Sequence, residues 1–181
     1  MFKRKTACTL AILLLLTTFF TFSFTGCGNK KSSTKDLKEI QVSMTTDKGE
    51  IVLLLRPDLM PVTVENFVGL VEKKFYDGLV FHRVEDWVIQ TGDPTATGSG
   101  GSDKTIKLET HAELKNVKYA VGMARLTDPN SASSQFYILR KDTSSLDGKY
   151  AIFGNVIKGQ EVVDKITKND KVKEIKILSK K

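Results

Sequence analysis

Two histidines and a glycine-rich stretch are the first residues of this sequence that could carry chemistry. A hydrolase would hold His82 or His111 beside a nucleophilic serine, but no serine has a Gly-x-Ser-x-Gly context and the chain order does not support a triad. A phosphate-binding loop would continue Thr97–Gly101 with Lys-Ser/Thr and a helix start, and neither follows. Hydrolysis and nucleotide binding are therefore not supported, and we expect no cofactor and no metal site.

Several other blocks of sequence form one ordered pattern. They are Phe81–Val84, Trp87–Asp93 with the loop Gly98–Gly101, Gly122–Arg125, Asp128–Ile138 and Leu146–Gly154. In this order they closely resemble the cyclophilin family of peptidyl-prolyl cis-trans isomerases, over roughly residues 40–178. The resemblance implies a mainly β fold, a closed eight-stranded antiparallel barrel capped by two α-helices. It also implies that the protein accelerates rotation about peptide bonds before proline, without a cofactor.

The resemblance gives individual side chains a role. Twisting an X-Pro amide breaks its conjugation against a barrier of about 20 kcal/mol, so a catalyst needs a hydrogen-bond donor that stabilises the twisted amide. The resemblance implies that the Arg83 guanidinium is this donor. It places apolar side chains around the proline, two glutamines on the substrate backbone, and the backbone of Ala124 and Arg125 beside an extended substrate. The substrate-binding residues that it implies are Trp87, Val88, Gln90, Gly98, Ala124, Arg125, Gln135, Tyr137, Leu146 and Tyr150.

The chain departs from the family pattern at four places. Three residues separate Arg83 from Trp87 where the pattern has four, and Trp87 replaces the usual Phe. Ser145 stands where cyclosporin-sensitive relatives carry Trp, which implies weak cyclosporin binding, and Tyr150 occupies a position often held by His. The shorter turn leaves an alternative function open, a membrane-tethered binding module or chaperone for proline-containing segments with little turnover.

Short apolar alternations between turn residues predict the strands that would position these side chains. A hairpin is expected over Ile40–Leu55, with its turn at Thr46–Gly49. Apolar residues at helical spacing predict helices over 61–74 and 160–167. The stretch 93–118 is expected to be a loop packed over the barrel. Six further strands are expected at 80–84, 87–91, 119–124, 135–140, 151–157 and 172–178.

Side chains on a strand alternate between its two faces, and this separates pocket residues from core residues. Val88 and Gln90 would share the pocket face, as would Gln135 and Tyr137. His82, next to the catalytic arginine, would point to the opposite face and have a hydrogen-bonded structural role. The residues expected in the core are Ile89, Phe136, Ile138 and Phe153.

The amino terminus has the layout of a bacterial lipoprotein signal. A basic start, Met1–Lys5, precedes an apolar run of about fifteen residues that is too short for a comfortable membrane span and ends in Gly26-Cys27. We expect residues 1–26 to be removed, Cys27 to carry lipid, and residues 27–38 to form a flexible linker to an isomerase domain at 39–181. An uncleaved anchor and an ordinary secretion signal are the alternatives. All three interpretations of the amino terminus place the domain outside the cytoplasm.

Amino-acid composition limits the classes of partner that the protein is expected to bind. A chain of 181 residues with 40% hydrophobic content has room for one packed domain. Without the leader, 25 basic and 21 acidic residues remain, so the mature chain is only mildly basic and a nucleic-acid partner is not expected. Cys8 would leave with the signal peptide, so the domain would have no free thiol. We expect a lipid-anchored monomer whose partners are proline-containing polypeptides and the bacterial membrane.

Overall fold

The computed structural model describes residues 37–181, and the predicted signal peptide, Cys27 and most of the predicted linker lie outside the described residues. Within the described part, the α-helices are α1 (Pro61–Glu72) and α2 (Gln160–Lys165), and neither has the length and hydropathy that a membrane crossing requires. A short 3-10 helix spans Ser144–Leu146. The strands are β1 (Ile40–Thr46), β2 (Gly49–Leu55), β3 (Arg83–Glu85), β4 (Val88–Thr91), β5 (Ala120–Met123), β6 (Phe136–Leu139), β7 (Ile152–Lys158) and β8 (Val172–Lys180).

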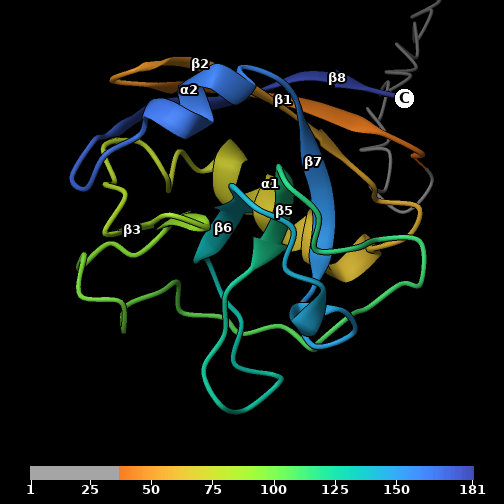
Figure 1. Ribbon diagram of the computed structural model, residues 1–181. Coiled ribbons are helices and arrows are strands. Elements are labelled where there is room, and N and C mark those ends of the chain that lie inside the picture. Colours follow the sequence, from red (N-terminus) through yellow and green to blue (C-terminus); the bar gives the residue numbers. More distant parts are fainter. Residues whose placement is uncertain (1–36) are drawn as a thin grey trace, which may run out of the picture. The chain divides into compact units, whose positions relative to one another are not determined.

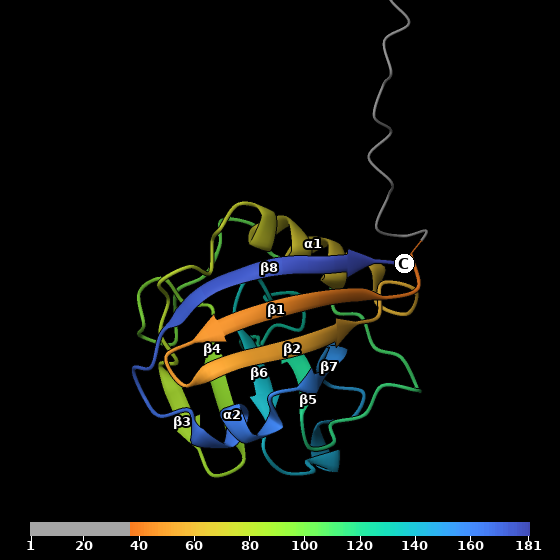
Figure 2. The same ribbon diagram turned by 90° about the horizontal axis from the view of Figure 1, so that it is seen from above.

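All these strands form one antiparallel sheet in the order β3-β4-β6-β5-β7-β2-β1-β8. The sheet curls around the core, with α1 and α2 on opposite sides of it (Figures 1 and 2). The predicted β1–β2 hairpin is confirmed, with Thr46 paired to Gly49 across its turn. The mainly β class and the order of elements expected from the sequence are therefore correct.

The expectation of a closed barrel is wrong, because the sheet is open between β3 and β8. β3 has only three residues and pairs with β4 alone before the chain turns back. The chain ahead of β3 contacts the start of β8 and the residues just before it: the Gly78 N–H donates to Val172 O (2.7 Å), the Phe81 N–H donates to Asp170 O (2.9 Å), and Val80 forms a single bridge with Lys171. These contacts end before a ladder forms, so the sheet is an open half-barrel.

Helix α1 packs its apolar face into the centre of the core. It buries the predicted apolar stripe of Val64, Phe67, Val68 and Val71. The Phe67 ring centroid lies 5.2 Å from those of Tyr76, Phe136 and Phe153, and all four rings are fully buried. The helix ends at Glu72, ahead of the predicted Lys74, because Lys74 has a left-handed φ of 56° that stops the helix.

The long loop after β4 packs over the fold as predicted, and one side chain ties it to α1. The Glu109 carboxylate accepts hydrogen bonds from the Val62 N–H (3.0 Å) and from the N–H and hydroxyl of Thr63 (both 2.7 Å). A carboxylate at this position satisfies donors that the first turn of a helix leaves free. Further along, Ile106 forms a bridge with Ala132. The loop is therefore held by contacts between segments far apart in the sequence.

Candidate active site

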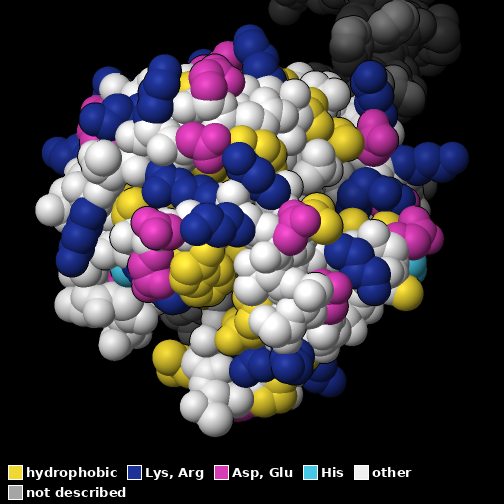
Figure 3. Space-filling view, viewed as in Figure 1, with side chains coloured by type: hydrophobic (Ala, Val, Ile, Leu, Met, Phe, Trp, Pro, Cys, Tyr) yellow, Lys and Arg dark blue, Asp and Glu magenta, His cyan; other side chains and the backbone are white. Residues whose placement is uncertain are grey.

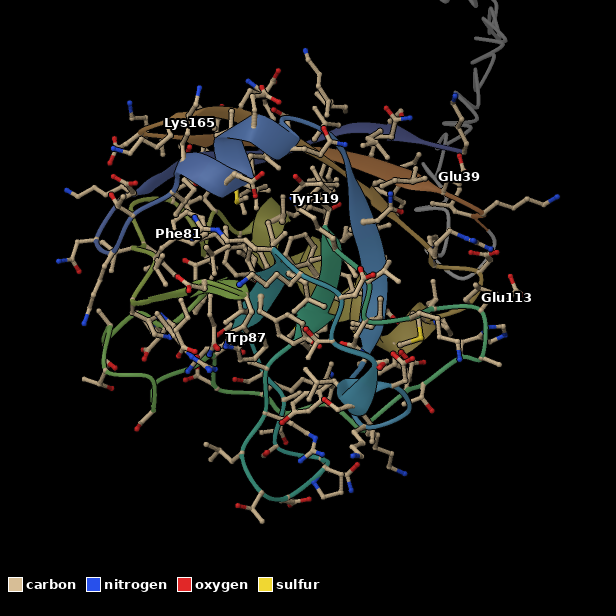
Figure 4. The ribbon with its side chains drawn as sticks, in the orientation of Figure 1. Glu39, Phe81, Trp87, Glu113, Tyr119 and Lys165 are labelled. Carbon is tan, nitrogen blue, oxygen red and sulfur yellow. The ribbon has the colours of Figure 1, made fainter. Side chains whose placement is uncertain are left out.

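Two neighbouring hollows contain every predicted substrate contact. The first, called here the aromatic pocket, is lined by Arg83, Trp87, Val88, Gln90, Ala124, Arg125, Tyr137, Leu146 and Tyr150. The second, called the loop pocket, shares Gln90, Ala124 and Arg125 with the first and adds Gly98 and Gln135. Figure 3 shows hydrophobic side chains beside a hollow on this face, surrounded by acidic and basic side chains, and Figure 4 labels Trp87 at the same place.

One row of residues crosses four adjacent strands beneath the aromatic pocket. Arg83 on β3 lies opposite Gln90 on β4, Gln90 lies opposite Tyr137 on β6, and Tyr137 lies opposite Gly122 on β5. Opposed residues on neighbouring strands point to the same face of a sheet, so these side chains reach the pocket together. Their neighbours Ile89, Phe136 and Ile138 face the main core as predicted and are fully buried there, as is Val121 beside Gly122.

The Tyr137 ring forms a fixed apolar floor. It is 4% exposed, and its hydroxyl donates to Asn116 Oδ1 (2.9 Å), which Asp147 holds through two further hydrogen bonds (2.7 and 2.9 Å). A Cβ at Gly122 would overlap the Tyr137 hydroxyl, so the ring needs a glycine opposite it. Burial raises the pKa of Tyr137, and the phenol therefore stays neutral.

A chain of hydrogen-bonded amides connects Arg83 to the glycine-rich loop. Arg83 Nη1 donates to Gln90 Oε1 (3.3 Å), and Gln90 Nε2 donates to Gln135 Oε1 (2.7 Å). Gln135 Nε2 then donates to the carbonyl oxygens of Gly98 (3.0 Å) and Gly100 (2.7 Å). Each amide sets the orientation of the next, so the glycine-rich loop fixes the end of this hydrogen-bonded series that lies farthest from Arg83.

Asp93 anchors this loop, a role that was not predicted from the sequence. Its buried carboxylate accepts hydrogen bonds from the N–H and hydroxyl of Thr95 (both 2.7 Å), the Gly98 N–H (2.6 Å) and the Gly100 N–H (3.2 Å). Burial opposes the charged form, but these hydrogen bonds outweigh it and lower the pKa of Asp93 to about 2. The available signal was the sequence Asp93-Pro94-Thr95 just after β4 ends at Thr91, a pattern typical of a turn in which an Asp side chain binds the backbone two residues on.

The shortened turn after Arg83 is a tight hairpin. The β3–β4 ladder ends at the Glu85–Val88 pair, which leaves Asp86 and Trp87 as a two-residue turn. The Arg83 guanidinium carbon lies 5.2 Å from the Trp87 ring centroid, within the range of a cation–π contact. Arg83 therefore lines the aromatic pocket although the spacing is one residue shorter.

Loop residues form the opposite wall of the pocket. Arg125 donates to Leu126 O (2.9 Å) and Lys149 O (3.1 Å), and its guanidinium carbon lies 4.7 Å from the Tyr150 ring centroid. The Tyr150 ring meets Tyr137 edge-on with centroids 6.1 Å apart. This wall thus joins two loops that are remote in sequence.

Comparison with known proteins decides the family. The family model described as cyclophilin type peptidyl-prolyl cis-trans isomerase/CLD matches residues 41–181. The chain belongs to this family. The cyclophilin domain therefore spans the whole sheet, both helices and both pockets, and the recognition made from sequence blocks is confirmed at the level of the family.

Named relatives agree with this assignment. The chain is 41% identical over 134 residues to peptidyl-prolyl cis-trans isomerase-like 3 of Rattus norvegicus, covering 71% of this chain and 83% of the relative. It is also 41% identical over 126 residues to peptidyl-prolyl cis-trans isomerase ppi1 of Schizosaccharomyces pombe, covering 67% of this chain and 81% of the relative. This cyclophilin is a peptidyl-prolyl cis-trans isomerase.

Solved structures show the same fold. A cyclophilin type peptidyl-prolyl cis-trans isomerase of Cryptosporidium parvum matches with a TM-score of 0.73 and 29% identity, over 78% of this chain and 98% of that one. The same enzyme, solved in the presence of the dipeptide Ala-Pro, matches with a TM-score of 0.71 and 31% identity, over 77% of this chain and 99% of that one.

His82 takes no part in the pockets of this cyclophilin. It is buried, as expected for a side chain turned away from the pocket, but neither ring nitrogen makes a hydrogen bond within residues 37–181. The predicted hydrogen bonds are therefore not found. Burial lowers the pKa of His82 despite the nearby Asp93, so the ring is neutral at pH 7.

Proposed function

We propose that Arg83 catalyses isomerisation by donating an N–H to the nitrogen of a twisted X-Pro amide. The observation that carries this proposal is the row of Arg83, Gln90 and Tyr137, which puts a guanidinium beside an apolar floor that suits a proline ring. Rotation breaks conjugation, so the nitrogen lone pair that resonance delocalises in the planar amide becomes localised and can accept a hydrogen bond. A donor placed there stabilises the transition state more than the ground state, which is the requirement for catalysis.

We propose that the aromatic pocket receives the proline ring and that Gln90 and Gln135 bind the substrate backbone. The Cryptosporidium parvum relative solved with Ala-Pro supports a minimal X-Pro unit as ligand. Recognition through backbone and a proline-shaped pocket places few demands on flanking side chains, so the substrate range should be broad. Uncatalysed X-Pro bonds take tens to hundreds of seconds to isomerise, so folding chains are the substrates that benefit most.

Exchange NMR on a short Ala-Pro peptide tests this function. Acceleration of cis-to-trans exchange by the folded protein is expected, together with chemical-shift changes of residues that line the aromatic pocket. Peptide binding without acceleration would leave the binding-module alternative standing. Arg83 lines the aromatic pocket beside the tight turn at Asp86–Trp87, so the shorter spacing does not favour that alternative.

We further propose that the enzyme is a lipoprotein, anchored through Cys27 to a bacterial membrane and acting outside the cytoplasm on exported proteins. The support is in the sequence: a basic start, a short apolar run, and Gly26-Cys27 at its end. Two acyl chains on one cysteine hold a protein on a bilayer stably, where one chain would not.

Replacing Cys27 by Ser in the full chain is expected to abolish acylation and move the protein out of the membrane fraction. Fractionation followed by mass spectrometry of the amino-terminal peptide measures both effects. Cys8→Ser is the matched control, because Cys8 lies inside the segment expected to be cleaved, and it should behave as the parent. A Cys27→Ser protein that still sediments with membranes would favour an uncleaved anchor.

Cyclosporin is expected to bind weakly, because Ser145 offers neither the apolar area nor the indole N–H of the Trp found in sensitive relatives. Ser145 lies exposed in the 3-10 helix Ser144–Leu146, at the edge of the aromatic pocket that Leu146 lines. Ser145→Trp should tighten cyclosporin binding at least tenfold in a calorimetric titration. Ser144→Trp controls for added surface area alone, and equal gains from both variants would contradict this explanation.

A further inference from the structure

One carboxylate joins two walls of the aromatic pocket. Glu85 ends β3, and its Oε1 accepts a hydrogen bond from Arg83 Nε (2.7 Å) while its Oε2 accepts one from Trp87 Nε1 (2.8 Å). Arg83 also lies over the Trp87 ring at 5.2 Å. The three side chains therefore contact one another pairwise, although Glu85 itself does not line the pocket.

The short turn makes this triangle possible. Arg83 and Glu85 are two residues apart on one strand, so their side chains share a face. The two-residue turn brings Trp87 back within reach of the same carboxylate. A turn that is one residue longer would change where the aromatic side chain leaves the backbone, so the Glu and the short spacing belong together.

The hydrogen bonds of Arg83 also define which of its nitrogens is left for a substrate. Nε is bound by Glu85 and Nη1 by Gln90. Nη2 makes no hydrogen bond to any residue in the described range 37–181. With two of three nitrogens held, the planar guanidinium has one orientation, and its remaining N–H groups are set by Glu85 and Gln90 together.

We propose that Glu85 is a positioning residue for isomerisation, which aims the Arg83 guanidinium and fixes the Trp87 ring in the aromatic pocket. This inference rests on the proposed catalytic role of Arg83. Both charged side chains are partly exposed, at 43% and 45%, so their ion pair adds little to stability. The effect of the ion pair appears instead in the rate of isomerisation. An arginine side chain that is already oriented loses less conformational entropy when it binds the transition state.

The test compares Glu85→Ala and Glu85→Gln with the parent by exchange NMR of an Ala-Pro peptide at saturating and limiting concentrations. Glu85→Ala should lower kcat about tenfold, equivalent to about 1.4 kcal/mol, with KM changed less than twofold and the melting temperature unchanged. Glu85→Gln keeps acceptor capacity without the charge and should lower kcat less. Asp86→Ala is the matched control, since Asp86 is in the same turn and makes no side-chain hydrogen bond within the described domain.

Two spectroscopic signals separate positioning from mere structure. Trp87 is the only tryptophan in the sequence, so its fluorescence and indole N–H resonance report on the Glu85 contact directly. Both should change in Glu85→Ala, together with the Arg83 Nε–H resonance, and stay as in the parent in Asp86→Ala. An unchanged kcat in Glu85→Ala, with or without altered spectra, would overturn the positioning role of Glu85 and leave the proposed role of Arg83 standing. Full activity in Arg83→Ala, measured beside it, would overturn the role of Arg83 and this inference with it.

Discussion

Arg83→Ala is expected to lower kcat/KM for an Ala-Pro peptide about 100-fold, which corresponds to about 2.7 kcal/mol of lost transition-state stabilisation. This magnitude is that of a charge-assisted hydrogen bond, typically about 1.5–3 kcal/mol. The Arg83 side chain is 43% exposed and belongs to an edge strand, so its loss should leave folding intact. Exchange NMR gives the rate, and thermal unfolding monitored by circular dichroism checks the fold.

Arg83→Lys is the informative companion. Lysine keeps the positive charge but lacks the planar fork of donors that Gln90 and Glu85 hold in place. It should recover only part of the rate, at least tenfold below the parent. Parent-like rates in Arg83→Ala, in a folded protein that binds the peptide, would show that catalysis does not use this guanidinium.

Asp93→Ala is expected to lower both stability and activity. The substitution leaves the N–H groups of Gly98 and Gly100 without their acceptor, and we expect unfolding to become easier by about 3 kcal/mol. The carbonyl oxygens of the same two glycines hold Gln135, so a displaced loop also disorders the amide chain that reaches Arg83. Urea unfolding should show the loss of stability, and kcat/KM should fall more than tenfold. A stable variant with a parent-like rate would contradict the anchoring role.

A comparison of the parent with Asp93→Asn measures how the stabilisation by the Asp93 carboxylate depends on pH. The pKa of Asp93 falls from an ordinary 3.8 to about 2 in the folded protein. A lowered folded-state pKa means that the stabilisation is present above about pH 4 and is lost as the pH falls through 2. The difference in unfolding free energy between the parent and Asp93→Asn should therefore shrink between pH 4 and pH 2. A difference that stays constant over this range would show that the carboxylate charge does not matter.

Local patterns correctly predicted which face of the strands several candidate site residues occupy. Alternation along β4 and β6 separated Val88, Gln90 and Tyr137 from core residues, because a strand's two faces follow directly from its backbone. The sequence blocks then supplied the other predicted substrate contacts, and all of these line one of the two pockets, whereas Ser102, Thr105 and Leu126 of the loop pocket lie outside the blocks. Neither argument needs knowledge of which strands are neighbours.

What the sequence could not predict depends on contacts between distant segments and on the detailed geometry of local turns. Closure of the sheet requires β3 and β8 to pair, and whether a three-residue strand continues into a ladder is decided by its surroundings. The roles of Asp93 and Glu85 come from backbone turns that bring donors to one carboxylate. His82 illustrates the same limit, since its face was foreseen but its lack of hydrogen bonds was not.

The open side of the half-barrel has a consequence for how the enzyme loses activity. Arg83 lies on β3, an edge strand with a three-residue ladder to β4, and the segment before it adds only isolated backbone hydrogen bonds near the start of β8, while the core lies under α1 and the longer strands. Edge strands with few hydrogen bonds open locally at a lower free energy than the whole domain unfolds. Heating or mild denaturant will therefore release the arginine from its site while most of the sheet is still folded. In this cyclophilin, catalytic activity is therefore lost under milder conditions than those that unfold the whole domain.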